Sequence, residues 1–205
     1  MKYFHYTLEI DGDNEAGYVN LGYSLMNERR PYEALEYLKK GLELNTGSVN
    51  SIWNLSLIQL MLGNYKEGWD LYEARFGTEQ FKDYIWPSSG LRINKIDEIN
   101  ATEKTPLLVW CEQGMGDAIQ FCRYLYLLRA REIPFVFCTR ENLLDLMKNW
   151  LPFPDQVILE KTWDPKKDQR PQIPIMSLPR LFKTETHTIP SQCPYLIPPE
   201  KIPDR

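Results

Sequence analysis

The sequence matches itself when it is shifted by about 34 residues, and this internal period limits the fold more than any other feature. The shift superposes Asn20-Leu21 on Asn54-Leu55 and Glu33 on Glu67. Periods of roughly 20 to 50 residues are typical of solenoids, in which each unit is one supersecondary structure stacked on the next. The period therefore predicts stacked pairs of antiparallel helices over residues 1–76.

The observed period is also the length of a tetratricopeptide repeat. In the first unit, small residues at Gly22, Ala34 and Gly41 are expected to let the two helices approach closely. The second unit runs from about 49 to 76, with Gly63-Asn64 as the break between its helices. Its last part places aromatic residues on one helical stripe, which predicts a packed core in preference to a cofactor site.

A further shift by the same period aligns residues 1–10 with the end of a second helix in such a pair. Two interpretations stay open. Either the array is truncated at its N-terminus, or residues 1–10 form a degenerate capping helix at a natural start. Solenoids usually need about three or more units for stability, because each unit buries its faces against neighbours.

A different pattern begins at Leu107, where a short apolar run leads into a glycine-containing turn and then into a helical pattern. The run from Leu107 to Trp110 is too short and too apolar for an exposed helix, so a buried parallel strand is predicted. Gly114 and Gly116 are expected to relieve the steric limits on a tight strand-to-helix turn. Asp117 stands where the new helix needs a cap, and a cap alone contributes about 1 kcal/mol.

Strands and helices alternate after this turn. The sequence predicts a second strand over 135–139, a helix over 142–150, a third strand over 156–160 and a fourth over 173–176. This alternation favours a right-handed, mostly parallel, Rossmann-like sheet. Ser177 either caps the short helix that follows or turns its hydroxyl toward the ligand crevice.

In open parallel sheets, ligands bind in the crevice outside the carboxyl ends of the strands. The predicted strand, the Gly-x-Gly turn and the helix start at Asp117 therefore make a candidate site. A purely structural alternative stays open, in which Asp117 is only a helix cap, because folds of this class host many unrelated sites.

The run from Glu112 to Tyr124, EQGMGDAIQFCRY, is similar to the EQGxGDxxQFxRY signature of bacterial tetratricopeptide-repeat proteins that carry a glycosyltransferase-like domain. A second block, from Met176-Ser177-Leu178 to Pro194-Tyr195-Leu196, resembles that family's SLPxxxxTxxxxIPxxxPYL segment. With the repeats, the resemblance covers nearly the whole chain. It implies an α + α/β protein: tetratricopeptide repeats over 1–76, a linker over 77–104, and a Rossmann-like N-terminal half of a GT-B fold over 105–205.

The resemblance also implies roles for residues in the turn. Asp117 matches the position at which related heptosyltransferases carry an aspartate proposed as general base for the acceptor hydroxyl, and such a base must reach that hydroxyl. Arg123 is interpreted either as a structural ion-pair partner or as an anion contact. The expected catalytic residue is Asp117, and the expected substrate-binding residues are Glu112, Gln113, Gly114, Gly116, Gln120, Arg123 and Ser177.

Asn20 and Asn54 occupy the same place in the two repeats, at the sixth position of the first helix, which faces the groove. Amide side chains there can both donate to and accept from a peptide backbone. The arrangement resembles the asparagine ladder of eukaryotic O-linked N-acetylglucosamine transferases. The alternative is an ordinary pair of polar residues on a solvated helix face.

The function expected from the resemblance is sugar transfer shared between two Rossmann-like halves, with the acceptor mainly in the N-terminal half and the sugar nucleotide mainly in the C-terminal half. This chain looks like the first half only, so we expect no transferase activity from it alone and no cofactor within it. The repeats would bind a protein, a peptide or the glycan acceptor, and the donor would be a nucleotide sugar. The alternative is a non-catalytic protein–protein interaction scaffold.

Composition and charge limit which binding partners and which cellular location can be expected for this protein. The net charge is −4 with basic residues scattered among acids, so a nucleic-acid partner is not expected. The sequence lacks an apolar run of membrane-spanning length and a cleavable signal pattern, which predicts a cytoplasmic protein without a membrane span. The 4 cysteines lie far apart and only 2 histidines accompany them, so buried reduced thiols are expected, without a disulfide framework or a metal site.

Overall fold

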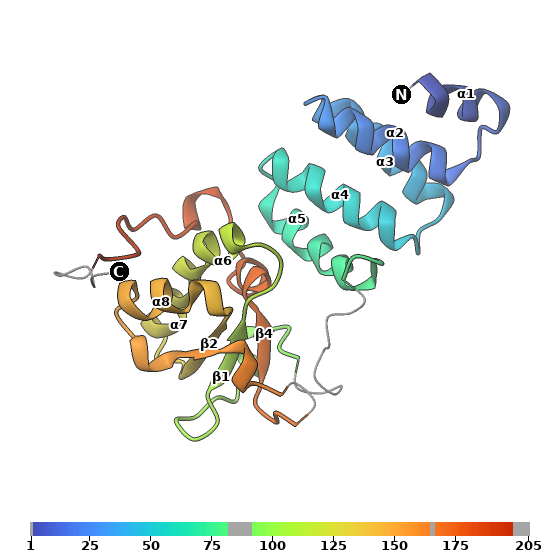
Figure 1. Ribbon diagram of the computed structural model, residues 1–205. Helices are drawn as coiled ribbons and strands as arrows, with labels where there is room; N and C mark the ends of the chain where they lie inside the picture. The colour runs from blue at the N-terminus through green and yellow to red at the C-terminus, as the bar shows by residue number, and fades with distance from the viewer. Residues whose placement is uncertain (1, 82–91, 165–166, 199–205) are drawn as a thin grey trace. The chain divides into compact units, whose positions relative to one another are not determined.

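The computed structural model describes residues 2–81, 92–164 and 167–198 (Figure 1). The described residues divide into two compact units. One is helical and comprises residues 2–81 with 183–188, and the other is an α/β unit comprising the remaining described residues. Residues 82–91 of the predicted linker lie outside the described residues.

The helices of the first unit recur at the period of the sequence. They are α1 (Lys2–Ile10), α2 (Glu15–Asn27), α3 (Pro31–Leu44), α4 (Val49–Met61) and α5 (Tyr65–Tyr72). Helices α2 and α4 each have 13 residues and begin one period apart, at Glu15 and Val49. Helices α3 and α5 also begin one period apart, at Pro31 and Tyr65. Each unit of sequence therefore corresponds to one pair of helices joined by a short turn.

The first helix of each pair starts with the same kind of cap. The side chain of Asn14 accepts a hydrogen bond from the Gly17 amide at 2.8 Å. Ser48, at the equivalent place in the next repeat, accepts one from the Ser51 amide at 3.3 Å. A cap of this kind stabilises a helix start by about 1 kcal/mol because it satisfies an orphan amide.

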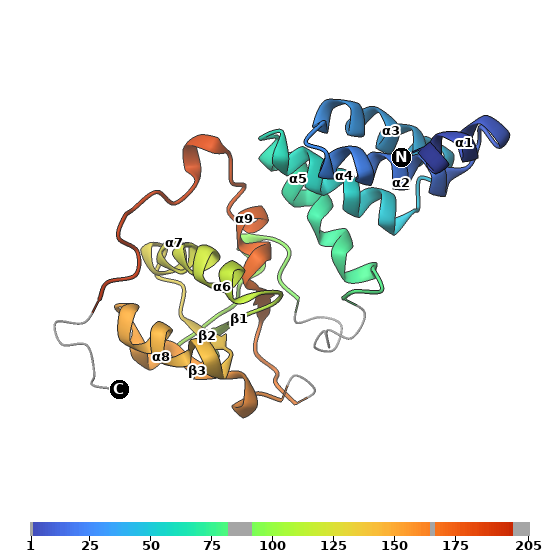
Figure 2. The ribbon, with the colours of Figure 1, turned by 45° about the horizontal axis from the view of Figure 1, so that its top comes forward.

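Small residues bring paired helices together, as the sequence predicts. A Cβ on Gly22 would stand 2.6 Å from Cγ of Leu38, so only glycine fits between α2 and α3 at this point. Figure 2 shows α2 running alongside α3, and α4 alongside α5. The core between them holds Val19, Leu21, Leu25, Ala34, Leu38, Leu55 and Ile58.

The predicted aromatic stripe at the end of this unit is core. Trp69 and Tyr72 are buried, and the ring of Tyr72 lies 4.8 Å from that of Trp53. A 3-10 helix, Glu73–Gly77, follows α5. Within it Arg75 is fully buried, 2.9 Å from Glu73, so this buried cation has a carboxylate partner.

The α/β unit contains one parallel sheet of four strands in the order β3-β2-β1-β4. The strands are β1 (Leu107–Trp110), β2 (Phe135–Thr139), β3 (Val157–Leu159) and β4 (Gln172–Pro174). All four residues of β1 are buried, which confirms a central apolar strand. The fourth strand is shorter than predicted, because it ends at Pro174, which has no amide to donate, and a 3-10 helix, Ile175–Ser177, follows.

The helical segment after β1 differs from the prediction in two ways. It begins at Met115, two residues before Asp117, and it is divided into α6 (Met115–Phe121), a 3-10 turn (Cys122–Tyr124) and α7 (Leu125–Ala130). At the division, Cys122 Sγ and Arg123 Nε donate to the carbonyls of residues 119 and 120 at 3.1 and 2.8 Å. These side chains compete with the backbone ladder, which is a known cause of helix irregularity.

Three further segments belong to the α/β unit. Ile93, within the predicted linker, is buried and donates its amide to the Gln172 carbonyl at 3.2 Å. Helix α8 (Glu141–Trp150) follows β2, close to its predicted bounds, and α9 (Leu178–Leu181) follows β4. Figure 1 shows α6, α7 and α8 beside the sheet.

Three of the four thiols are buried, as predicted, but Cys193 is exposed, and all four are free. Cys193 lies in the extended, proline-rich C-terminal segment, where no helix or strand covers it among the described residues. Within the part of the chain that the structure describes, no helix has both the length and the apolar character needed to cross a membrane.

Candidate functional site

The topology of the sheet selects one place for a ligand. The chain runs from β1 outward through β2 to β3 and then returns to place β4 on the other side of β1. The connection after β1 leads to β2 on one side of β1, and the connection after β3 brings β4 to its other side, so the strand order reverses between β1 and β4 and a switch point lies at their carboxyl ends. The two sequence blocks described above begin two residues after these strands end, at Glu112 and Met176.

The left-handed residue of the β1–α6 turn is Gln113 and not a glycine. Gln113 has φ 59°, whereas Gly114 has φ −84° and is the N-cap residue of α6. A left-handed conformation is uncommon for a residue with a side chain and costs about 1 kcal/mol or more. The two glycines were predicted to relieve the steric limits on this turn, but the residue in the left-handed conformation is Gln113, immediately before Gly114.

Asp117 acts as a cap from inside the helix. It is the third residue of α6, and its Oδ2 accepts the Gly114 amide at 2.9 Å. Among the described residues, no donor is hydrogen-bonded to its second oxygen, Oδ1. The Asp117 side chain is half-buried. Its Oδ2 caps the helix, and its Oδ1 can therefore accept a hydrogen bond or a proton from a ligand.

The glycines differ in what surrounds them. A Cβ on Gly114 would meet Oδ2 of Asp117 at 3.1 Å, so a side chain there would crowd the cap. A Cβ on Gly116 would meet no atom within 4 Å. Packing therefore gives no reason for glycine at 116, although glycine weakens a helix by up to about 1 kcal/mol relative to alanine.

Glu112 is placed differently from the sequence expectation. It is fully buried, and its Oε1 accepts the Met176 amide at 3.2 Å. This bond joins the segment after β1 to the segment after β4. Glu112 therefore ties the two sides of the switch point together and does not line an open crevice.

The remaining predicted residues divide between the surface and the interior. Gln120 is exposed on α6. Ser177 is buried at the N-cap position of α9, but its side chain makes no capping hydrogen bond. The switch point thus brings together the segments that carry Glu112, Gln113 and Ser177, while Gln120 lies in the second turn of α6.

Arg123 holds the C-terminal segment. Its NH1 group donates to the Pro190 carbonyl at 3.2 Å, and its guanidinium carbon lies 4.3 Å from the centre of the Tyr195 ring. The Tyr126 hydroxyl donates to the Tyr195 carbonyl at 2.6 Å. Within the protein, Arg123 therefore contacts backbone carbonyls and an aromatic face in place of the carboxylate of an ion pair. A contact of Arg123 with an anion stays a prediction.

Sequence reasoning missed two neighbours of the turn. Asn142, at the start of α8, places its amide nitrogen 2.8 Å from the sulfur of Met115, whose side chain is exposed at the start of α6. Arg140 precedes α8, and its Nε lies 3.9 Å from Glu160. Asn142 and Arg140 both closely follow the predicted strand over 135–139, and that position was the signal by which the sequence could have identified them.

Asn20 and Asn54 lie at equivalent positions on α2 and α4, since both stand five residues after the first residue of the helix. Asn20 is exposed and Asn54 is half-buried. The structure therefore places the two asparagines at equivalent positions, each on the first helix of a pair.

A cavity of about 460 Å³ lies at the opposite edge of the sheet, near the amino-terminal end of β2. Its lining includes Arg129, Pro134, Phe153 and Asp155 and none of the predicted site residues. Ligands of open parallel sheets bind at the carboxyl ends of the strands, so the switch point remains the better candidate. Within the described ranges, no group of three or more His, Cys, Asp or Glu side chains is placed to hold a metal ion.

Comparison with known proteins does not assign the chain to a family. A scan against protein-family models found no match. A search of curated proteins also found no match.

Proposed function

We propose that the α/β unit forms the acceptor side of a sugar-transfer site and that the helical unit is a tetratricopeptide array that binds a protein partner or the acceptor. The observation that carries this proposal is the turn at the β1–β4 switch point. There, the space above Gly116 is open and Asp117 keeps one carboxylate oxygen without a partner among the described residues. The resemblance of residues 112–124 to transferase-like proteins supports the same site.

In the proposed reaction, Asp117 Oδ1 takes the proton of an acceptor hydroxyl. The oxygen then forms a bond to the anomeric carbon of the donor, and the bond from that carbon to the phosphate oxygen of the nucleotide breaks, which releases the nucleotide. The bond from the Gly114 amide to Oδ2 fixes the carboxylate for this step. The open backbone at Gly116 lets the acceptor approach it.

Two residues support the site from within the fold. Glu112 fixes the spacing of the β1 and β4 ends, and Arg123 fixes the segment that carries Pro190 and Tyr195. The donor is a nucleotide sugar held by a second Rossmann-like half, and such donors suit a cytoplasmic protein. No step of this proposal requires a bound metal or a cofactor.

The direct test is consumption of a nucleotide sugar by the natural protein that contains this chain. Phosphorus NMR would follow UDP-, GDP-, ADP- and CMP-activated sugars with and without cell extract as the source of acceptor. Release of nucleotide that depends on the extract supports the proposal. Intact donors in every mixture would contradict it.

A non-catalytic scaffold is the second candidate, and the equivalent placement of Asn20 and Asn54 favours it. Paired amides on successive helices can hold an extended peptide backbone. On this reading, the double variant Asn20→Ala with Asn54→Ala loses affinity for a bound peptide, and no form of the protein releases nucleotide. Full peptide affinity in the double variant would exclude the asparagine pair as the binding feature.

A further inference from the structure

The first helices of the two pairs, α2 and α4, carry almost no charge. Helix α4 has no Asp, Glu, Lys or Arg among its 13 residues, and α2 has only Glu15. The carboxylate of Glu15 accepts the hydroxyls of Ser48 and Ser51 at 2.6 and 2.7 Å, so it is bound within the array. The second helices differ, because α3 has five charged residues among 14 and α5 has three among 8. Among these four helices, charge is therefore concentrated on α3 and α5.

One stripe of α2 and α4 is nevertheless open to solvent, and we call it the neutral stripe. Its members on α2 are spaced by three and four residues, which places them on one face, and each has an equivalent one period later on α4. The tyrosine of the stripe is 48% exposed and its methionine is 53% exposed. All eight members are exposed or half-buried: Ala16 with Asn50, Asn20 with Asn54, Tyr23 with Leu57, and Asn27 with Met61.

Stacking of the helices does not cover the neutral stripe. Helix α1 packs on α2 so closely that a Cβ on Gly17 would stand 2.8 Å from Cδ2 of Leu8. On the other side, Leu55 of α4 shares a core with Leu21 of α2. Tyr23 stays exposed although α2 has neighbours before and after it in the array. Because a solenoid unit contacts only its neighbours, the stripe is a side of the array and not an uncovered end.

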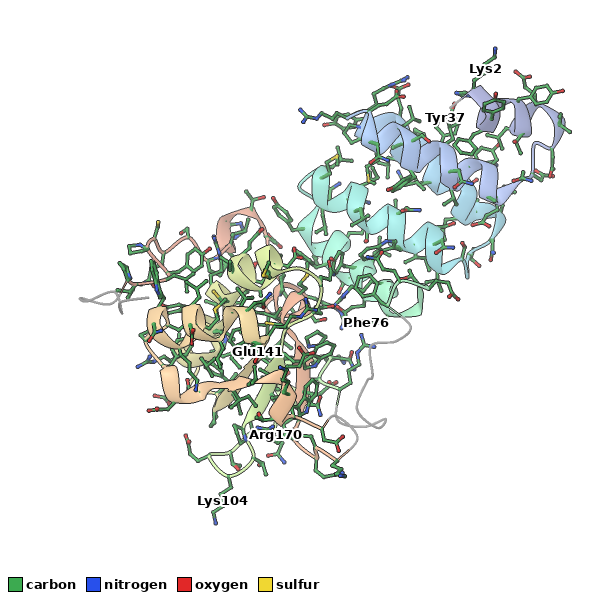
Figure 3. All side chains as sticks on the ribbon, in the orientation of Figure 1. Lys2, Tyr37, Phe76, Lys104, Glu141 and Arg170 are labelled. Carbon is green, nitrogen blue, oxygen red and sulfur yellow. The ribbon has the colours of Figure 1, made fainter. Side chains whose placement is uncertain are left out.

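The tyrosine of the stripe differs from the tyrosines that pack the array. Tyr37 on α3 is half-buried, and its ring lies 6.1 Å from that of His5 and 6.3 Å from that of Tyr18. Figure 3 shows Tyr37 beside α1. The ring of Tyr23 has no comparable ring contact within the described part of the chain. An exposed tyrosine offers a ligand a rigid apolar surface with a polar tip.

The asparagines of the stripe are suited to a peptide backbone. Asn20 and Asn54 lie inside their helices and do not cap them, since the caps are Asn14 and Ser48. Asparagine is also one of the weaker helix formers, so helix stability gives no reason for it there. Each amide can donate to a carbonyl and accept from an N–H group. Packed helices lie about 8 to 10 Å apart, which corresponds to about three residues of an extended chain.

We propose that the neutral stripe binds an extended peptide segment that has no charged side chains and places one bulky nonpolar side chain against Tyr23, Leu57 and Met61. The inference rests on the second candidate function, a scaffold that binds peptide through Asn20 and Asn54, and it names the class of peptide. A charged side chain would lose water against this surface without gaining a partner, which costs free energy. Binding is therefore nearly independent of salt, because salt screens charges.

Selection from a phage-displayed library of random peptides tests this with the whole chain immobilised. Peptides of about nine residues span about 30 Å when extended, which is enough to cross both helices. The retained peptides are expected to share a segment that lacks Asp, Glu, Lys and Arg and contains one bulky nonpolar residue. Their dissociation constants, measured by calorimetry on the synthetic peptides, are expected to change less than about twofold between about 50 and 500 mM sodium chloride.

A pair of matched variants locates the site. Tyr23→Lys places a charge on the neutral stripe and removes its aromatic surface, so it is expected to weaken the selected peptides at least about tenfold. Tyr32→Lys makes the same change at a 75% exposed tyrosine of α3 and leaves the dissociation constant unchanged. Far-ultraviolet circular dichroism checks that both variants keep their helices.

The outcomes separate this inference from the function on which it rests. Retained peptides that need Asn20 and Asn54 but carry charges, or that dissociate as salt rises, overturn the inference and leave the scaffold in place. Equal effects of Tyr23→Lys and Tyr32→Lys also overturn it. A library from which the chain retains no peptide overturns both the inference and the scaffold.

Discussion

At the scale of single residues, the turn after β1 combines a fixed carboxylate with an uncovered backbone. Asp117 uses one oxygen to cap α6, and Gly116 next to it has open space where a side chain would stand. Gln113 adds a strained backbone at φ 59°. Strain of this kind persists when the surrounding structure holds it, and it is concentrated at functional sites.

Gly116→Ala is expected to keep the fold and impair the function. The new methyl group meets no atom within 4 Å, and alanine favours a helix by up to about 1 kcal/mol, so the unfolding free energy stays level or rises. The methyl group stands in the proposed approach path of the acceptor, which predicts a fall in kcat/KM of about tenfold or more, or about 1.4 kcal/mol.

The matched control is Gly47→Ala, in a turn of the helical unit. A Cβ at Gly47 would meet only Oδ1 of Asn45, at 3.8 Å. Turnover and thermal unfolding of both variants would be measured together. A Gly116→Ala protein that turns over as fast as the Gly47→Ala protein would show that the open space at Gly116 is not used.

The residue types of the turn could be predicted from the sequence, but their surroundings could not. The sequence places Glu112 just after a strand, where side chains commonly face a ligand. Its burial depends on the Met176 amide, which is 64 positions away in the sequence. The exposure of Cys193 is of the same kind, because it depends on whether a distant element covers the C-terminal segment.

At the scale of helices and strands, α2 can pack against α3 because a glycine lets the two backbones come close together. Gly22 lies against Leu38 where no side chain fits. The same substitution, glycine to alanine within a helix, therefore has opposite effects at Gly22 and Gly116. Intrinsic helix propensity favours it at both positions, and packing opposes it only at Gly22.

Gly22→Ala is expected to destabilise the helical unit by about 1 to 3 kcal/mol, the usual cost of overpacking a core. Its Cβ would stand 2.6 Å from Cγ of Leu38, so the leucine or the helix must move. Urea unfolding followed by circular dichroism gives the free energy. Leu38→Ala also costs stability because Leu38 is fully buried, so if the clash is the cause the double variant should lose less than the two single losses added together. Wild-type stability of Gly22→Ala would contradict the close approach of the two helices.

Elements with strong periodicity or strongly apolar runs could be predicted, and their irregular ends could not. The internal period predicted the helix pairs, and the apolar run at Leu107–Trp110 predicted the central strand. The division between α6 and α7 arises from hydrogen bonds of Cys122 and Arg123 to backbone carbonyls. Such bonds leave no apolar pattern, so a single helix was the natural expectation.

At the scale of the whole molecule, the four thiols report whether the chain is folded. Burial raises the pKa of Cys111, Cys122 and Cys138 to about 12 from an ordinary value of 9.0. Cys193 is exposed. Buried protonated thiols are poor nucleophiles, since the thiolate is the reactive form.

Iodoacetamide at neutral to mildly alkaline pH is therefore expected to modify one thiol of the folded chain, Cys193, and all four after unfolding. Mass spectrometry counts the labels, and Cys193→Ser should take up none while folded. More than one rapid label on the folded chain would contradict the burial of the other three.

The same thiols predict a dependence of stability on pH. Their folded pKa values lie above the unfolded value, so their contribution is complete below about pH 9 and is lost as the pH rises toward about 12. In that window the unfolded chain releases protons that the folded chain keeps, and the unfolding free energy falls by at most about 1.4 kcal/mol per thiol for each pH unit. Urea unfolding at several pH values measures the slope, and stability that rises above pH 9 would contradict it.

Asp117→Asn is the most direct test of the proposed function, because it removes the proton-accepting role proposed for Asp117 and little else. Asparagine can still accept the Gly114 amide, so α6 keeps its cap and the unfolding temperature stays that of the wild type. Asp117→Ala, which removes the cap as well, should lose about 1 kcal/mol. The measurement is the rate of nucleotide release by the natural protein that carries Asp117→Asn. A fall of about 100- to 10,000-fold is the predicted result, the range for a general base, whereas a wild-type rate would show that Asp117 is only a helix cap.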